Sequence, residues 1–195
     1  MQLMIYGLFV LLGVHVVPLV FPRWRQRQIG RFGERSWKGV FALVALAGLV
    51  LTCIGFGQAR RLPLVLYAPP PAMDHLNALF TLVAFVLTAA AYVPRNHIKA
   101  AVGQPMLLGV AVWASGHLLA TGLLHDVVLF GAFLAWSVPM AIWLRQRERL
   151  EGVVHAPGTL RGDVVTVVIG VIAWGSFAFW LHRWLIGVDP MSGMH

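Results

Sequence analysis

Charged residues are scarce in this 195-residue chain, because Asp, Glu, Lys and Arg together make up only 11% of it. A soluble domain carries about a quarter charged residues, so this sequence could not cover its own surface with groups that water solvates. Apolar residues make up 59% of the chain, and its mean hydropathy is +0.78. Both values exclude an ordinary water-soluble domain and favour a lipid bilayer as the solvent.

Charges are also missing from the middle of the apolar segments, where no Asp, Glu, Lys or Arg occurs. This absence argues against a proton pump or an ion channel built on carboxylates. The net charge of +8 would suit nucleic acid. However, the basic residues are confined to short connections between apolar runs, which is typical of membrane topology rather than of a duplex-binding face. We therefore expect a lipid bilayer, and no nucleic acid, as the partner.

Cysteine is nearly absent as well, since Cys53 is the only one in the chain. A single cysteine cannot form an internal disulfide. Because Cys53 lies in an apolar run, we interpret it as a small core residue rather than as a reactive thiol.

Six apolar segments are long enough to cross a bilayer, some of them only just, since a spanning helix needs about 20 mostly apolar residues. They are Leu3–Phe21, Gly39–Gly57, Leu76–Val93, Pro105–Thr121, Val127–Trp143 and Val164–Ile186. The first has no basic residues before it and no small-residue cleavage site, so we interpret it as a retained helix. The sequence thus predicts an all-α, polytopic transmembrane bundle of about six helices, with residues 1–195 forming a single domain.

Lysine and arginine are distributed unevenly between the two sides of this predicted bundle. The connections 22–38, 94–104 and 144–163 hold 12 of these residues, and the opposite side holds 3. Because basic loops stay in the cytoplasm, we expect both termini on the periplasmic side of a bacterial-type inner membrane. The outer connection Gln58–Met73 contains the prolines 69–71 and is expected to be irregular, lying at the membrane interface.

Histidine is the polar residue type whose placement points to a site. Six of the eight histidines fall at segment ends or in connections, where a solvated or interfacial role is expected: His75, His97, His125, His155, His182 and His195. Only His15 and His117 lie well inside apolar segments, where a polar residue usually faces the bundle interior with a partner. The simple interpretation is that each one hydrogen-bonds a neighbouring helix. The sharper hypothesis is that both bind one metal centre.

Two neutral imidazoles from two helices are a common way to hold the iron of a b-type haem inside a bundle. Gly13 and Gly116 each lie within two positions of one of these histidines and offer room for a flat porphyrin. No Cys-x-x-Cys-His motif is present, which excludes a c-type haem, and zinc would require more ligands close together. By helix rise, His15 lies roughly 9 to 15 Å and His117 roughly 18 Å from the inner edge, a mismatch that helix tilt could absorb.

Two further residue types could serve such a haem. Arg35 follows Glu34 just before the second apolar segment, where helix capping and topology are the simple interpretation and pairing of Arg35 with a haem propionate is the alternative. Trp113, Trp136 and Trp174 lie away from the membrane edges, so they are either core residues or the lining of a pocket for a flat ligand.

Several of these residues fall in blocks along which the chain resembles the NnrU family of bacterial membrane proteins. That family includes the NnrU domain of the plant and cyanobacterial 15-cis-zeta-carotene isomerase. The blocks occur in order over roughly residues 4–145, whereas the last apolar segment has no characteristic motif. They are Gly13-Val14-His15, Gly33 to Phe41, Ala91 to Asn96, Pro105 to Gly109, Trp113 to Ala120 and Val128 to Gly131.

The resemblance implies a link to nitrite and nitric oxide metabolism in denitrification for the bacterial members. For the isomerases it implies haem b held by histidines that match His15 and His117. Two positions depart from the pattern. Ala114 stands where the isomerases carry a cysteine, three residues before the second histidine, which counts against isomerase activity. Gln104 stands where the family often has the histidine of Arg-His-Pro, so we assign it no role.

Three functions are consistent with the sequence. The first is a membrane haem protein of the NnrU type with a redox or sensing role and a redox partner. The second is a haem-dependent cis-trans isomerase of a carotenoid-like polyene, an apolar substrate that suits a hydrophobic bundle. The third is a cofactor-free membrane scaffold or assembly factor, in which the histidines serve as interhelical hydrogen bonds.

Overall fold

The structure is a computed structural model that describes residues 1–70 and 72–190, so Pro71 and His195 lie outside the described residues. Within those two ranges every regular element is a helix, and the one β-type pairing is an isolated bridge between Val65 and Leu123. The predicted all-α class is therefore confirmed.

Five helical stretches among the described residues are long and apolar enough to cross a membrane. They are α1 (Gln2–Val20), α3 (Glu34–Ala59), α4 (Met73–Tyr92), α7 (Leu124–Leu150) and the continuous run of α8 (Leu160–Ser176), η1 (Phe177–Leu181) and α9 (His182–Ile186). The sixth predicted segment forms α6 (Pro105–Ala120), which is apolar but has only 16 residues. A membrane helical protein is thus supported, while the number of six spans and the side of the termini stay predictions.

The basic connections are more helical than the sequence predicted. The stretch 22–38 contains α2 (Pro22–Phe32), the stretch 94–104 contains α5 (His97–Val102), and α7 continues to Leu150. Pro22 occupies the first turn of α2, where its missing N–H costs nothing. Arginine and glutamine, which make up much of α2 and of the end of α7, are good helix formers, so these two stretches are helical.

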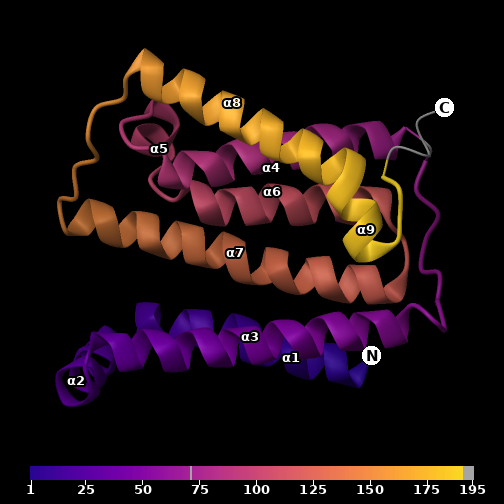
Figure 1. Ribbon diagram of the computed structural model, residues 1–195, viewed down its shortest axis with the longest axis horizontal. Helices are drawn as coiled ribbons and strands as arrows, with labels where there is room; N and C mark the ends of the chain where they lie inside the picture. The colour runs from indigo at the N-terminus through magenta and orange to yellow at the C-terminus, as the bar shows by residue number, and fades with distance from the viewer. Residues whose placement is uncertain (71, 191–195) are drawn as a thin grey trace. The chain divides into compact units, whose positions relative to one another are not determined.

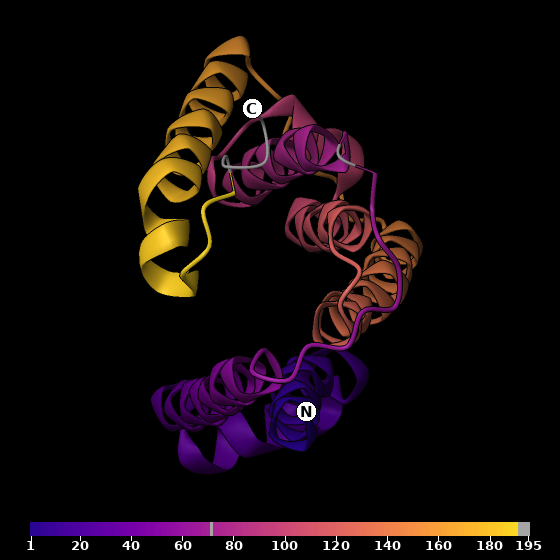
Figure 2. The same ribbon diagram turned by 90° about the vertical axis from the view of Figure 1, so that its right-hand side faces the viewer.

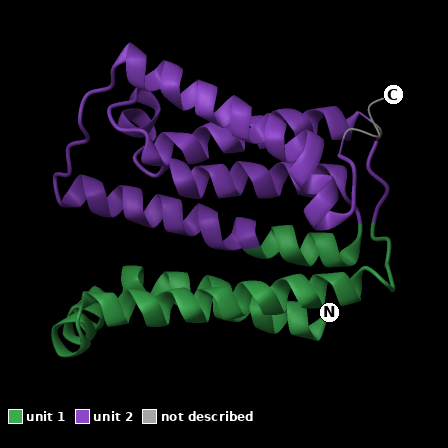
Figure 3. Cartoon of the chain, viewed as in Figure 1, with its two compact units in different colours: residues 1–66, 123–132 green, residues 67–122, 133–195 purple. Residues whose placement is uncertain are grey.

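The described chain groups into two compact units, shown in two colours in Figure 3. Unit 1 holds residues 1–66 and 123–132, and unit 2 holds residues 67–122 and those from 133 onward. α7 therefore begins in unit 1 and continues in unit 2. That residues 1–195 act as one domain stays a prediction.

In unit 1, α1 and α3 run antiparallel and touch through small residues (Figure 1). A Cβ added at Gly48 would lie only 2.6 Å from the backbone nitrogen of Leu11, and one added at Gly55 would collide with the backbone of Met4. Between these glycines, Thr52 turns its hydroxyl back to donate to the Gly48 carbonyl at 2.8 Å. The two backbones can approach this closely because no side chain separates them.

The exposed side chains of α3 and of α8 are mostly apolar. They include Leu43, Leu46, Val50 and Ile54 of α3, and Val164, Val165, Val167, Val168, Ile169, Val171 and Ile172 of α8. Lipid tails cover such a surface without penalty, whereas water would not. Cys53, predicted to be a core residue, is also exposed. That prediction was wrong, because its neighbours Thr52 and Gly55 take the positions that face α1.

In unit 2, α4 packs against both α6 and α8, as the end-on view in Figure 2 shows. A Cβ added at Gly109 of α6 would lie 3.0 Å from a carbonyl oxygen of α4. On the α8 side, a Cβ at Gly170 would lie 2.7 Å from the Cα of Val86. One turn further, the indole of Trp174 donates to the hydroxyl of Thr81 at 3.0 Å. Trp174 is thus a packing residue between α8 and α4.

The turn between α4 and α5 is held by Asn96, whose side chain is almost fully buried. Its amide nitrogen donates to the carbonyls of Val93, at 2.6 Å, and Ala90, at 2.9 Å, at the end of α4. Its amide oxygen accepts from the backbone N–H of Lys99 at 2.7 Å and so caps α5. One side chain therefore satisfies backbone groups at the ends of two helices.

The close contact between α1 and α3 predicts that alanine substitutions at two neighbouring glycines change the stability of the protein differently. We expect Gly55→Ala to lower the free energy of unfolding by about 1–3 kcal/mol, because its methyl group must push the α1 backbone away. A Cβ at Gly57 would meet no atom within 4 Å. Gly57→Ala is therefore the matched control and should leave stability unchanged or slightly raised. Unfolding midpoints in mixed micelles titrated with SDS measure both; equal midpoints for the two variants would contradict this contact.

Candidate functional site

His15 lies on α1 with its ring fixed by its own helix. Its Nδ1 is 2.7 Å from the carbonyl oxygen of Leu11, one turn earlier. Because a carbonyl only accepts, Nδ1 must carry the hydrogen and donate it, which leaves the lone pair of the neutral ring on Nε2. The ring also meets Phe41 of α3 edge to face, with 5.2 Å between centroids and 74° between planes. The half-buried imidazole is therefore held in one orientation by two contacts within unit 1.

His117 on α6 repeats this arrangement. Its Nδ1 lies 2.9 Å from the carbonyl oxygen of Trp113, again one turn earlier. The indole of Trp113 lies beside the imidazole, with ring centroids 5.2 Å apart, and meets Phe133 of α7 edge to face at 5.4 Å. The same argument gives His117 a hydrogen on Nδ1 and a lone pair on Nε2. Trp113 therefore sits against the imidazole rather than elsewhere in the core.

These two hydrogen bonds are the kind that metal-binding histidines make. A histidine that ligates a metal through one ring nitrogen usually donates the hydrogen of the other to a carbonyl or a carboxylate, which fixes its tautomer and orientation. In both rings that hydrogen goes to the backbone of the ring's own helix; that either ring binds a metal stays a prediction. His15 belongs to unit 1 and His117 to unit 2. Their convergence on one iron stays a prediction.

The two glycines beside these histidines have different surroundings. A Cβ at Gly13 would meet no atom within 4 Å, so this position offers open space. A Cβ at Gly116 would lie 2.6 Å from the Cβ of Phe80 and 2.7 Å from the amide oxygen of Asn77, both on α4. The small size of Gly116 is thus required by the packing of α6 against α4. Gly13 is not required by any such contact, and room for a flat ligand beside it stays a prediction.

Arg35 lies in the first turn of α3 with an exposed side chain. Its neighbour Glu34 forms an ion pair with Lys38 at 2.9 Å, and both side chains of that pair are well exposed. Pairing of Arg35 with a haem propionate stays a prediction. The cationic side chains that line a cavity in unit 1 are instead those of Arg25 and Lys38.

Gln104, which had no assigned role, has a partner in unit 2. Its amide nitrogen donates to a carboxylate oxygen of Glu148, near the end of α7. The same carboxylate lies 3.5 Å from a guanidinium nitrogen of Arg145 and 3.4 Å from Nε2 of His155. Arg145 also donates to the Ala101 carbonyl at 2.9 Å. Gln104 therefore helps to tie the start of α6 to the end of α7.

Two polar residues of unit 1 were missed by reasoning from the sequence. His125, expected to be solvated or interfacial, is only 3% exposed, and Asp126 beside it is 8% exposed. Their Nε2 and Oδ1 atoms are 3.6 Å apart, and the ring of Phe56 meets His125 edge to face at 5.2 Å. The available signal was the pairing of an acid with a histidine in the first turn of α7, where a carboxylate is favoured by the helix dipole.

Residues 1–70 and 72–190 contain no group of three His, Cys, Asp or Glu side chains close enough to hold a metal ion together. A zinc site made of protein ligands needs three or four such groups. A haem iron takes four nitrogens from the porphyrin and needs only one or two ligands from the protein.

The fold and these histidines define a class: a helical membrane protein that carries one backbone-anchored imidazole in α1 and another in α6. The chain belongs to the NnrU family, described as NnrU protein, which matches residues 3–190. This match extends the resemblance seen over residues 4–145 through the last helix. Comparison with curated proteins and with solved structures gives no match.

The anchoring of both rings predicts their tautomers. We expect His15 and His117 in the ligand-free protein to carry their hydrogen on Nδ1, because the carbonyls of Leu11 and Trp113 can only accept. Solid-state NMR of protein with ¹⁵N-labelled histidine measures this from the nitrogen shifts, with His15→Gln and His117→Gln assigning the signals. Signals that report hydrogen on Nε2 would contradict the geometry of these sites.

Proposed function

We propose that this NnrU-family chain is an integral membrane protein that binds a b-type haem, with His15 and His117 as its two axial ligands. The observation that carries the proposal is the anchoring of both imidazoles through Nδ1, at 2.7 and 2.9 Å from backbone carbonyls of their own helices. This arrangement fixes the orientation of each ring and places the hydrogen of a neutral imidazole on Nδ1. Iron binds the neutral form of imidazole, here through the remaining nitrogen, Nε2.

The surroundings of each histidine support a flat apolar group. Gly13 leaves open space on α1, and the rings of Phe41 and Trp113 lie beside the two imidazoles. Aromatic side chains of this kind pack well against a porphyrin face or edge and exclude water from it. The residues present therefore fit the group.

A haem held by His15 and His117 would supply one-electron exchange. The task of this chain's residues is to hold two neutral imidazoles in fixed orientations and to keep water away from them. The proposed role is therefore redox or sensing work, and we place it in nitrite and nitric oxide metabolism, as the family resemblance implies. Residence in the bacterial inner membrane with several spans is part of the same proposal.

The proposal predicts a spectrum and its loss. Protein purified in detergent with haem supplied should show the sharp reduced-minus-oxidised bands of a low-spin b-type haem. We expect His15→Ala and His117→Ala each to abolish the low-spin signature, because each removes one axial nitrogen. His97→Ala is the matched control, since the His97 side chain is exposed and its Nδ1 is held 2.6 Å from a carboxylate oxygen of Asp163. It should leave the bands unchanged.

Two outcomes would overturn the proposal. A protein that stays colourless with haem supplied, yet folds with a normal unfolding midpoint, would favour the cofactor-free scaffold. Bands that survive both His15→Ala and His117→Ala would place the iron elsewhere. Neither outcome depends on knowing a substrate or a redox partner.

The isomerase alternative is distinguished by turnover. Position 114, where the related isomerases carry a cysteine, is a fully buried alanine, so no thiol can exchange with an axial ligand there. We expect haem-loaded membranes to leave a cis-configured polyene unchanged when its isomers are followed by chromatography. Turnover that requires both His15 and His117 would make the chain an isomerase instead.

A further inference from the structure

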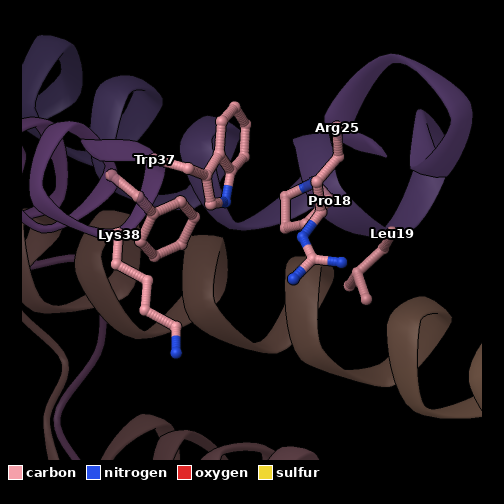
Figure 4. Close-up of a pocket in the computed structure, with 6 residues that line it drawn as sticks. Pro18, Leu19, Arg25, Trp37 and Lys38 are labelled. Carbon is pink, nitrogen blue, oxygen red and sulfur yellow. The ribbon is translucent and has the colours of Figure 1, made fainter. Parts of the chain in front are cut away.

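A cavity of about 370 Å³ opens in unit 1 where α1, α2 and α3 meet. Its lining residues are Pro18 and Leu19 of α1, Arg25 of α2, and Trp37, Lys38 and Phe41 of α3. Figure 4 labels all of them except Phe41. Four of these side chains are apolar or aromatic and two are cationic, and no carboxylate is among them. The lining therefore suits a molecule that is partly apolar and carries negative charge.

The charge around this cavity is strongly positive. Residues 22–38 hold six Lys and Arg and a single acid, Glu34. Glu34 pairs with Lys38 and lies near enough to Arg25 for their charges to interact. The Glu34 and Lys38 side chains are 61% and 69% exposed, and an ion pair that water reaches so freely is weak. An ammonium group also has three hydrogens to donate, so Lys38 keeps donors for a second anion.

The cavity lies at the level where lipid headgroups are expected. α2 has no buried residue, and its Trp24 meets Trp37 edge to face, with 5.5 Å between ring centroids. Tryptophans gather at the boundary between lipid tails and water, and a basic amphipathic helix lies along that boundary. On the orientation expected from the basic residues, this is the cytoplasmic face, where anionic phospholipids are found.

We propose that this cavity binds the headgroup of an anionic phospholipid, such as phosphatidylglycerol. The guanidinium of Arg25 and the ammonium of Lys38 take the phosphate, since a guanidinium can bind two phosphate oxygens at once. Pro18, Leu19 and Phe41 cover the start of the acyl chains. The lipid then fixes the junction between α1 and α3 without contributing to any haem chemistry.

Two other anions are less suited to the cavity. Free phosphate would leave its four apolar and aromatic side chains facing water. A haem propionate is a stronger alternative than free phosphate, because Phe41 both lines the cavity and contacts the His15 ring, with 5.2 Å between ring centroids. The lipid is favoured by the Trp24–Trp37 pair and by the exposed α2, which together mark a headgroup layer.

The test uses the full chain, delipidated in detergent and titrated with short-chain phosphatidylglycerol, phosphatidylcholine or inorganic phosphate. Native mass spectrometry counts retained lipids, and the shift in melting temperature gives the affinity. We expect phosphatidylglycerol to bind and stabilise, and the other two not to. The double variant Arg25→Gln/Lys38→Gln should bind phosphatidylglycerol about 25-fold more weakly, because each basic residue near an anionic headgroup contributes roughly a factor of five.

The matched control is Arg23→Gln/Arg27→Gln, which removes the same charge from α2 at exposed positions outside the cavity. It should weaken binding by less than about threefold, since only the general field of the basic segment is reduced. Arg25→Lys keeps the charge and tests whether the loss of lipid binding in the double variant is caused by misfolding. It should bind phosphatidylglycerol with intermediate affinity and have a normal melting temperature without lipid.

Three results would overturn the proposal: equal losses in the two double variants, binding of phosphatidylcholine as strong as that of phosphatidylglycerol, or displacement of the lipid by added haemin. The last would assign the cavity to haem carboxylates. The lipid titration gives its answer whether or not haem binds, so failure of this site and failure of the haem proposal are distinguishable.

Discussion

Close approach of helix backbones through small residues is the interaction on which both units depend. In lipid, apolar side chains gain nothing by leaving the solvent, so helices associate through van der Waals packing and hydrogen bonds. Such packing is strongest where glycine lets two backbones touch. Gly48 and Gly55 let α3 approach α1 closely, and Gly109 and Gly170 let α6 and α8 approach α4.

The lipid environment also explains how polar side chains inside the helices form their hydrogen bonds. A hydroxyl or imidazole inside a lipid-facing helix must satisfy its hydrogen, and the nearest acceptor is the carbonyl one turn earlier. Thr52, Thr88 and Thr166 donate to such carbonyls at 2.8 Å. His15 and His117 use Nδ1 in the same way. A threonine hydroxyl has only one hydrogen, and this bond satisfies it. An imidazole has a second ring nitrogen as well, and the proposed ligand role of His15 and His117 depends on that nitrogen.

The polar ends of the helices are organised differently from their middles. Asn96, Gln104 and Glu148 join helix ends to one another through side-chain hydrogen bonds. Here water and headgroups are near, so charged side chains cost little and can be numerous. Arg25 and Lys38, which line the cavity in unit 1, belong to such a charged stretch, which is why an anionic ligand is proposed there.

The sequence by itself determined the helical membrane class and the approximate bounds of the apolar helices, including the two that carry His15 and His117. Those properties depend on the length of apolar runs and on the cost of polar groups in lipid, both of which are local. Only the tertiary structure decided that Gly116 packs against Phe80, that Cys53 is exposed and that His125 is buried. Which face of a helix meets its neighbour depends on residues far apart in the chain, and helices that are apolar all round carry no periodic stripe to reveal it.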